Sequence, residues 1–245
     1  MNQNRIEEFK RIYHNLKLSH HPFHRMMKYL DWCFEGVDFR DKSVLDIGGG
    51  NGIYSFYSRL KGSSSALNLE PFAAGSTIFD FDGTEAIDNL SISVSNQTIQ
   101  DFSSNEKFDV IILHDSINHL DELMFEKIHQ DKNKFSEYKK LVNKIVSLLT
   151  SDGLIVVTDC SRRNFWGDLG LKSPFAPTID WHLHQTPQLV EKLFEDHMFK
   201  TKLRWSPFKR FGYFGRVLSK LGLIPSYFMQ SHFNIRLSNE KDDKH

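Results

Sequence analysis

The stretch VLDIGGGNG, residues 44–52, decides the fold. Its apolar half contains one acid, Asp46, and glycines follow at positions 48, 49, 50 and 52. The helical pattern IYSFYSRLK begins at residue 53, directly after these glycines. A strand, a glycine turn and a helix N-terminus leave backbone N–H groups open to the close approach of a ligand. The stretch therefore predicts a ligand-binding unit that starts with a buried strand over 43–47.

The spacing of the glycines separates this unit from two phosphate-binding motifs. In the dinucleotide fingerprint GxGxxG, the third glycine would fall at position 53, where this sequence has Ile53. A P-loop needs a lysine and a serine or threonine after its last glycine, and the sequence has neither there. We therefore do not expect a pyrophosphate to be what the glycines hold.

Strands and helices alternate outward from this unit. Further strands are predicted at 64–70, 91–95, 108–114, 154–160, 200–205 and 233–238. Helices are predicted at 5–18, 19–34, 53–61, 135–149 and 186–199, with SDG at 151–153 ending the fourth. The segment 71–90 is expected to be a helix or an irregular crossover, and the tail 239–245 to be disordered. Apolar strands that alternate with helices predict an α/β fold with a parallel sheet covered on both faces.

Composition narrows the class of protein. The chain has 245 residues and a formal net charge of zero, which argues against a surface built throughout for nucleic acid. Its two cysteines, Cys33 and Cys160, form no metal-binding spacing and predict buried thiols in a reducing, cytoplasmic compartment. The polar start MNQNRIEEFKR predicts no signal peptide, and no apolar run approaches the roughly 20 residues of a membrane span.

The pattern DIGGGNG resembles the first motif of the class I S-adenosylmethionine-dependent methyltransferase superfamily. FDVIILHDSINHL resembles its fourth-strand motif, and LLTSDGLIVVTD its fifth strand with the preceding turn. The resemblance runs from about residue 40 to 200 and implies a doubly wound, mostly parallel, seven-stranded Rossmann-like sheet with N-terminal helices. It implies one domain over 1–238, divided into a helical lid (1–40), a cofactor-binding core (41–160) and a substrate-side segment with closing strands (161–238).

The resemblance also implies a set of cofactor-binding residues. Glu70 closes the second strand, where the family places an acid against the two ribose hydroxyls, and Asp101 sits where the family's acid and its neighbour meet the adenine. S-adenosylmethionine carries a sulfonium, an amino acid end and an adenosine but no phosphate, so the glycines would make room for the methionine end. The implied residues are Asp46, Gly48, Gly49, Gly50, Asn51, Gly52, Glu70, Asp101, Phe102 and His114.

The stretch IFDFDGTE, residues 78–85, resembles the first motif of haloacid-dehalogenase-type phosphatases. That chemistry also needs a later lysine and an acidic pair at strand ends, and the only adjacent acids downstream, Asp242 and Asp243, lie in the polar tail. The stretch is therefore interpreted as a turn or a helix start, in which Asp82 and Gly83 supply the bend.

Methyl transfer needs a base only where the acceptor must lose a proton. His119, His114 and Asp115 follow the fourth strand and are the candidate catalytic residues, because ligands of such sheets bind at the carboxyl ends of the strands. A histidine with a pKa near 6.5 can deprotonate a hydroxyl held beside it. The alternative for His119, which is expected on a helix after that strand, is a packing or capping role.

Other residues near the same edge are candidates for the acceptor pocket: Arg162, Trp181, His182 and His184. A plain surface loop is the alternative for the last three. The sequence lacks the [DNS]PP[YFW] motif of DNA and RNA amino-methyltransferases after the fourth strand, and the Asp-Asn pair of catechol-type enzymes after the fifth. No metal is therefore expected.

The segment 200–220 is basic and aromatic, and no acid interrupts it. It could face an anionic substrate, RNA or a membrane surface, or simply be a solvated strand and loop. The sequence thus predicts a methyltransferase acting on oxygen or nitrogen of a small metabolite or glycan-type acceptor. Two alternatives stay open: an RNA- or protein-modifying enzyme that docks through this segment, and a catalytically silent cofactor-binding module. Oligomeric state is not predicted.

Overall fold

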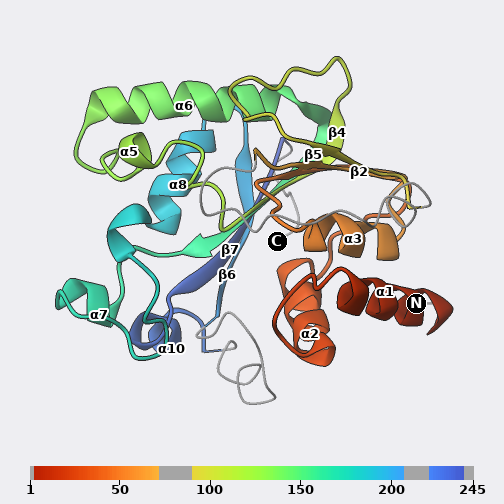
Figure 1. The fold of residues 1–245 in the computed structure, drawn as a ribbon. Coiled ribbons are helices and arrows are strands. Elements are labelled where there is room, and N and C mark those ends of the chain that lie inside the picture. Colours follow the sequence, from red (N-terminus) through yellow and green to blue (C-terminus); the bar gives the residue numbers. More distant parts are fainter. Residues whose placement is uncertain (1–2, 72–89, 207–220, 240–245) are drawn as a thin grey trace. The chain divides into compact units, whose positions relative to one another are not determined.

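The computed structural model describes residues 3–71, 90–206 and 221–239 (Figure 1). The chain divides into two compact units. The first is Met1–Leu113 with Leu148–Gly153, and the second is His114–Ser147 with Leu154–His245. The phosphatase-like stretch 78–85 and the acids of the tail lie outside the described residues.

The first unit contains the N-terminal helices and the strands around the glycine turn. Its elements are α1 (Gln3–Asn15), α2 (Phe23–Cys33), β1 (Ser43–Ile47), α3 (Ile53–Leu60), β2 (Ser65–Leu69), β3 (Ile92–Ser95) and β4 (Phe108–His114), whose last residue begins the second unit. α1 packs against α3, as Figure 1 shows. Tyr57 and Lys61, both near the end of α3, each place a polar atom 2.8 Å from Asp31 of α2.

The second unit contains the later helices and the last strands. Its elements are α5 (Glu122–Phe125), α6 (Lys132–Ser147), β5 (Leu149–Cys160), whose residues up to Gly153 belong to the first unit, α7 (Phe165–Asp168), the 3-10 helix η1 (Trp181–Leu183), α8 (Pro187–Phe194), β6 (Phe199–Ser206), α10 (Leu223–Phe228) and β7 (His232–Ser238). α6 buries Tyr138, Val142 and Ile145, which share one helical face, and packs against α5 and α8.

The strands form one seven-stranded sheet in the order β3-β2-β1-β4-β5-β7-β6. β1 runs parallel to both β2 and β4, and β2 runs parallel to β3. β7 is antiparallel to its two neighbours, β5 and β6. The predicted α/β sheet is therefore confirmed, and it closes on an antiparallel strand inserted between β5 and β6.

Most element boundaries agree with the sequence, but two predictions about local structure are wrong. β5 begins at Leu149, so SDG at 151–153 lies inside the strand and does not end a helix. β5 begins at Leu149 because the carbonyl of the preceding residue, Leu148, accepts a hydrogen bond of 2.8 Å from the N–H of Phe108, the first residue of β4. His119 lies in a turn before α5 and is not part of a helix.

Both cysteines are unpaired and buried, as their spacing predicted. Among the helices that the structure describes, none is long and apolar enough to cross a membrane. Most of the basic aromatic segment, residues 207–220, and nearly all of the polar tail, residues 240–245, lie outside the described residues.

Candidate functional site

The glycine turn of the first unit connects β1 to α3 and leaves no room for a side chain at Gly49. Gly52 caps α3 with a backbone φ of 71°, in the left-handed region that favours glycine. A Cβ atom added to Gly49 would lie 2.3 Å from Oδ1 of Asn68 and 2.5 Å from Cγ of Asp46. The turn is therefore packed so closely on polar side chains that only glycine fits at position 49.

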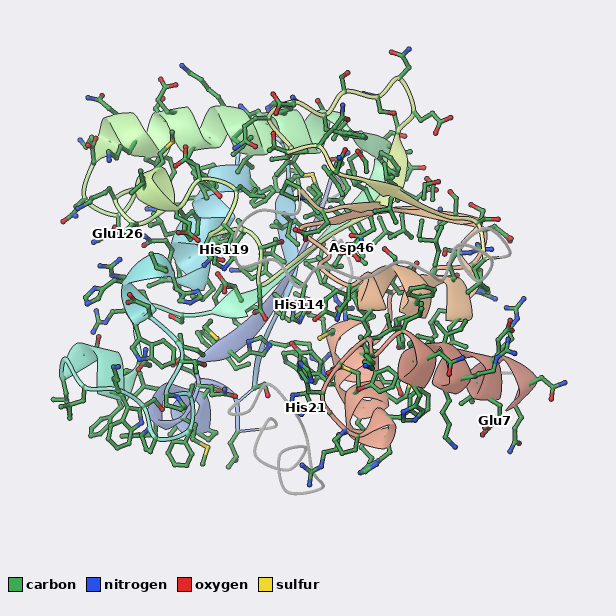
Figure 2. The ribbon with its side chains drawn as sticks, viewed as in Figure 1. Glu7, His21, Asp46, His114, His119 and Glu126 are labelled. Carbon is green, nitrogen blue, oxygen red and sulfur yellow. The ribbon has the colours of Figure 1, made fainter. Side chains whose placement is uncertain are left out.

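Asp46 is the fully buried acid beneath this turn (Figure 2). Its Oδ2 accepts hydrogen bonds from the N–H and hydroxyl of Ser55, at 3.2 and 3.0 Å. Its Oδ1 is buried with no hydrogen-bond partner among the described residues. Burial raises the pKa of this carboxyl to about 7, the bonds from Ser55 lower it in part, and the charge of Glu70 adds to the rise.

Glu70 follows the last residue of β2 and is buried. Its Oε2 accepts a hydrogen bond of 2.8 Å from the backbone N–H of Gly50. Asn68 donates from Nδ2 to the carbonyl of Gly50 at 3.0 Å, and its own Oδ1 is buried without a partner in the described residues. The acid at the end of the second strand thus holds the glycine turn itself.

These groups are chemically suited to a phosphate-free ligand with donors. Asp46, Glu70 and Asn68 present acceptor oxygens around the turn, and acceptors repel the oxygens of a pyrophosphate. An ammonium and a pair of ribose hydroxyls instead supply the donors that such oxygens accept. The residues present therefore fit S-adenosylmethionine.

Asp101 and Phe102, the residues expected beside the adenine, lie at the end of the turn after β3. Asp101 is exposed, and its Oδ2 accepts a hydrogen bond of 2.7 Å from the hydroxyl of Thr98. Phe102 is buried. The described bonds of Asp101 stabilise its own turn, and its contact with an adenine stays a prediction.

In the second unit, His114 and Asp115 stand at the end of β4. The His114 side chain is buried, and its Nδ1 lies 3.4 Å from Oδ2 of Asp115. Its ring centroid is 6.2 Å from that of His232 on β7. Asp115 has a positive φ of 49°, and its N–H donates to the carbonyl of Thr158 at 2.8 Å. His114 is thus enclosed among strand residues.

His119 has a different environment, although it lies only a few residues further along. Its side chain is 56% exposed, and its Nδ1 lies 2.5 Å from Oε1 of Glu122. Its Nε2 is 3.3 Å from the side-chain amide of Asn118. Figure 2 shows His119 close to α5, on the same part of the unit as Glu126. Both ring nitrogens of His119 therefore lie near polar side chains close to it in sequence, Glu122 at the start of α5 and Asn118 in the turn.

The residues expected to line the acceptor pocket do not share one environment. Arg162 donates to the carbonyl of His182 at 2.9 Å and reaches its ring at 3.4 Å, so the guanidinium fixes the loop before α8. Trp181 is buried and packs with Cys160 of β5. His182 is exposed. Their contacts with an acceptor stay predictions.

His184 and Asp159 form a pair that sequence reasoning missed. Asp159 is fully buried near the carboxyl end of β5, and its Oδ1 lies 2.9 Å from Nδ1 of His184. The same oxygen accepts the N–H of Cys160 at 2.7 Å. The His184 side chain is 13% exposed, and its Nε2 makes no hydrogen bond within the described part of the chain. The polar residue Asp159 inside an apolar strand was the signal available in the sequence.

The carboxylate of Asp159 controls the chemistry of His184. Burial on its own lowers the pKa of the imidazole, but the charge and hydrogen bond of Asp159 outweigh it, aided by Asp180, so the pKa is raised. A carboxylate at Nδ1 holds the proton on that nitrogen and leaves the lone pair on Nε2. His184 is therefore equipped as a base. No group of three or more His, Cys, Asp and Glu side chains in the described ranges is placed to hold a metal.

Comparisons with known proteins identify the family and the fold of the chain. The methyltransferase-domain family model matches residues 18–206. No curated protein sequence matches the chain significantly. Three solved structures illustrate the shared fold.

The first structure is NodS, an N-methyltransferase from Bradyrhizobium japonicum WM9 in complex with S-adenosyl-l-homocysteine. It is 15% identical over 98% of this chain and 100% of its own, with a TM-score of 0.51. The second is the 1,6-didemethyltoxoflavin-N1-methyltransferase of Burkholderia thailandensis with bound 1,6-didemethyltoxoflavin and S-adenosylhomocysteine. It is 10% identical over 97% of this chain and 85% of its own, with a TM-score of 0.52.

The third structure is the plantazolicin methyltransferase BpumL in complex with a pentazolic desmethylPZN analog and S-adenosylhomocysteine. It is 17% identical over 98% of this chain and 100% of its own, with a TM-score of 0.52. At these identities the three structures establish the fold, and the family model establishes the family. The chain therefore belongs to the methyltransferase-domain family, within the class I S-adenosylmethionine-dependent methyltransferases.

Proposed function

We propose that the chain methylates an oxygen or nitrogen of a small-molecule or glycan-type acceptor, and that His184, oriented by Asp159, removes the proton of that acceptor. The observation that carries the proposal is the 2.9 Å contact between Asp159 and Nδ1 of His184 at the carboxyl end of β5. A buried carboxylate that fixes a histidine tautomer is the arrangement that general bases use.

The chemistry of methyl transfer explains why one base suffices. When bound, S-adenosylmethionine supplies an electrophilic methyl group on a leaving group that needs no protonation. A hydroxyl or an N–H group of the acceptor becomes a good nucleophile as it loses its proton, and Nε2 of His184 can take that proton. A positioned base of this kind contributes roughly 10²–10⁴-fold to a rate. The acceptor class is therefore one with an ionisable O–H or N–H group.

Two of the three relatives were crystallised with an acceptor or an acceptor analog: 1,6-didemethyltoxoflavin and a desmethylPZN analog. Both bound compounds are consistent with a small-molecule acceptor here. We assign the cofactor to the glycine turn and to Asp46, Glu70 and Asn68, because their acceptor oxygens match its ammonium and ribose hydroxyls.

The experiment combines an acceptor screen with matched histidine variants. The purified chain is incubated with methyl-labelled S-adenosylmethionine and a panel of phenols, sugars and amines, and products are identified by mass spectrometry. For an acceptor that is turned over, we expect His184→Gln to lower kcat about a hundredfold or more. His119→Gln, the matched control, should keep kcat within about twofold.

The pH profile separates a base from a structural histidine. Because the pKa of His184 is raised, the unprotonated base prevails only above the usual histidine range, so kcat should rise with pH through a value above about 6.5. Asp159→Asn removes the charge that raises this pKa and should move the rise to lower pH. A His184→Gln enzyme with full kcat and an unchanged profile would exclude the assigned base.

A further inference from the structure

Helices α1 and α3 of the first unit line a cavity of about 280 Å³. The two helices pack against each other (Figure 1). Each contributes side chains three and four positions apart, which share one helical face: residues 5, 8, 9 and 12 of α1, and residues 56, 59 and 60 of α3. The volume is close to the lower end of the range of small-molecule sites, roughly 300–1,000 Å³.

Most of the described lining of this cavity is hydrocarbon. The apolar side chains that line it are Phe9, Ile12, Phe56, Leu60 and Leu90, and the first four are buried. Hydrocarbon walls gain most from a ligand with an apolar body, because its burial removes apolar surface from water on both sides.

One charged group of the lining has a buried donor without an acceptor. Nε of Arg59 donates to the carbonyl of Leu90, whereas its Nη1 is buried and has no hydrogen-bond partner in the described part of the chain. Burial lowers the pKa of Arg59, and the charge of Arg5, which also lines the cavity, lowers it further. A buried cationic donor that lacks an acceptor is costly, and a bound anion would supply the acceptor.

The remaining two charged side chains, Arg5 and Glu8, are exposed and lie one helical turn apart on α1. Within the ranges that the structure describes, neither Arg5 nor Arg59 forms an ion pair. The described lining therefore holds two guanidinium groups against a single carboxylate. This balance of charge favours an anionic ligand over a cation.

The cavity is separate from the glycine turn. α3 starts at Ile53, directly after that turn, whereas Arg59 and Leu60 stand at its other end. Leu90 lies before the first residue of β3, and Glu70 follows the last residue of β2, the parallel neighbour of β3. The charged end of the cavity and the acid of the glycine turn are thus at opposite edges of the same parallel strands.

We propose that this cavity binds a small organic anion, a carboxylate on an aromatic or aliphatic body, independently of the cofactor. The carboxylate pairs with Arg59 and Arg5, whose planar guanidinium groups match its two oxygens. The apolar body packs between Phe9 of α1 and Phe56 of α3. Inorganic phosphate fits poorly, because it would leave the hydrocarbon walls uncovered.

The test uses the whole chain, labelled with nitrogen-15, and two probes of equal shape. Amide NMR spectra are recorded as naphthylacetate, or its neutral analogue naphthylacetamide, is added. We expect naphthylacetate to produce saturable shifts at the amides of 5–12 and 56–60. The amide probe should bind at least about tenfold more weakly, a difference of ~1.4 kcal/mol, because it brings no charge to the guanidinium groups. Saturation with S-adenosylhomocysteine should leave naphthylacetate bound.

Matched arginine variants locate the anion. Arg59→Gln should weaken naphthylacetate at least about tenfold, and Arg5→Gln, at an exposed position where the fold tolerates the change, at least about threefold. Arg11→Gln is the control, since Arg11 is exposed on the same helix and does not line the cavity. Its affinity should equal that of the unmodified chain. Circular dichroism checks the fold of all three variants, and Arg5→Gln decides the question if Arg59→Gln does not fold.

Four results would overturn the proposal. Naphthylacetate that causes no saturable shift in α1 and α3 would exclude an organic anion from the cavity. Equal affinity for the acid and the amide probe would exclude recognition by the guanidinium groups. Equal affinity of the Arg5→Gln and Arg11→Gln chains would place the probe elsewhere, and displacement by S-adenosylhomocysteine would place it in the cofactor site.

Discussion

Asp46, beneath the glycine turn, makes the stability of the chain depend on pH. Its pKa of about 7 in the folded chain means that the native carboxyl keeps its proton up to near neutrality, whereas the unfolded chain loses it near pH 4. Between these two pKa values the native state binds a proton that the unfolded state has lost. The contribution of Asp46 to the free energy of unfolding therefore falls as pH rises. The loss is complete above pH 7 and is on the order of 4 kcal/mol, at about 1.4 kcal/mol per pKa unit.

The measurement compares the native chain with Asp46→Asn in urea unfolding at about pH 4.5 and pH 8. The asparagine oxygen still accepts from Ser55 but does not titrate. We expect the native chain to lose stability relative to the variant as pH rises. A stability difference between the two proteins that is the same at both pH values would show that burial does not perturb Asp46.

Glu70 supports both the turn and the proposed ribose contact. Glu70→Ala removes the acceptor that Gly50 uses, and it is expected to weaken S-adenosylhomocysteine binding at least about tenfold, or ~1.4 kcal/mol. Glu70→Gln keeps one acceptor oxygen for Gly50 and should lose less. Isothermal titration calorimetry measures both variants. Unchanged affinity in Glu70→Ala would remove this acid from the cofactor site.

The positions of some individual site residues could be predicted from the sequence better than those of others. Asp46, Gly49 and Glu70 lie together because a strand, a turn and the next strand fix their distance, which motif spacing encodes. The pairing of Asp159 with His184 joins residues 25 positions apart through a loop whose path no local pattern specifies. His119 follows β4 as predicted, but the turn before α5 places its side chain against Glu122.

The start of helix α8 is specified fully by the sequence, although the helix ends at Phe194 and not at the predicted residue 199. Thr186 caps it, with its hydroxyl oxygen accepting the N–H of Leu189 at 3.3 Å, and Pro187 follows at the first helical position. Thr186→Ala should lower the free energy of unfolding by about 1 kcal/mol, because an N–H at the helix start loses its partner. Thr186→Ser, which keeps the hydroxyl, is the control. Chemical denaturation that gives equal stability for both variants would contradict the cap.

Strands with continuous apolar residues were also predicted well, since burial on both faces leaves a plain signal in β1 and β4. The early start of β5 was not predicted, because SDG is a turn signal in isolation. The early start of β5 depends on the hydrogen bond between the N–H of Phe108 and the carbonyl of Leu148, and these residues are 40 positions apart in the chain.

For the whole molecule, cofactor binding at the glycine turn should raise the free energy of unfolding of the first unit. S-adenosylhomocysteine at about a hundredfold excess over its Kd is expected to add about 2.7 kcal/mol to the free energy of unfolding. Hydrogen exchange should slow at the amides of 48–52 and of Glu70, and NAD should produce neither change. Protection that appears only in the second unit would place the cofactor elsewhere.

The position of β7 has a consequence for biosynthesis. β6 pairs with β7, and β7 in turn pairs with β5, so β6 reaches the sheet only through a strand encoded after it. A nascent chain released by the ribosome before residue 232 lacks the bridging strand and carries β6 with its backbone groups unpaired. Premature termination between residues 206 and 232 would therefore remove β7 and leave β6 unpaired, and such a product is expected to aggregate or be degraded.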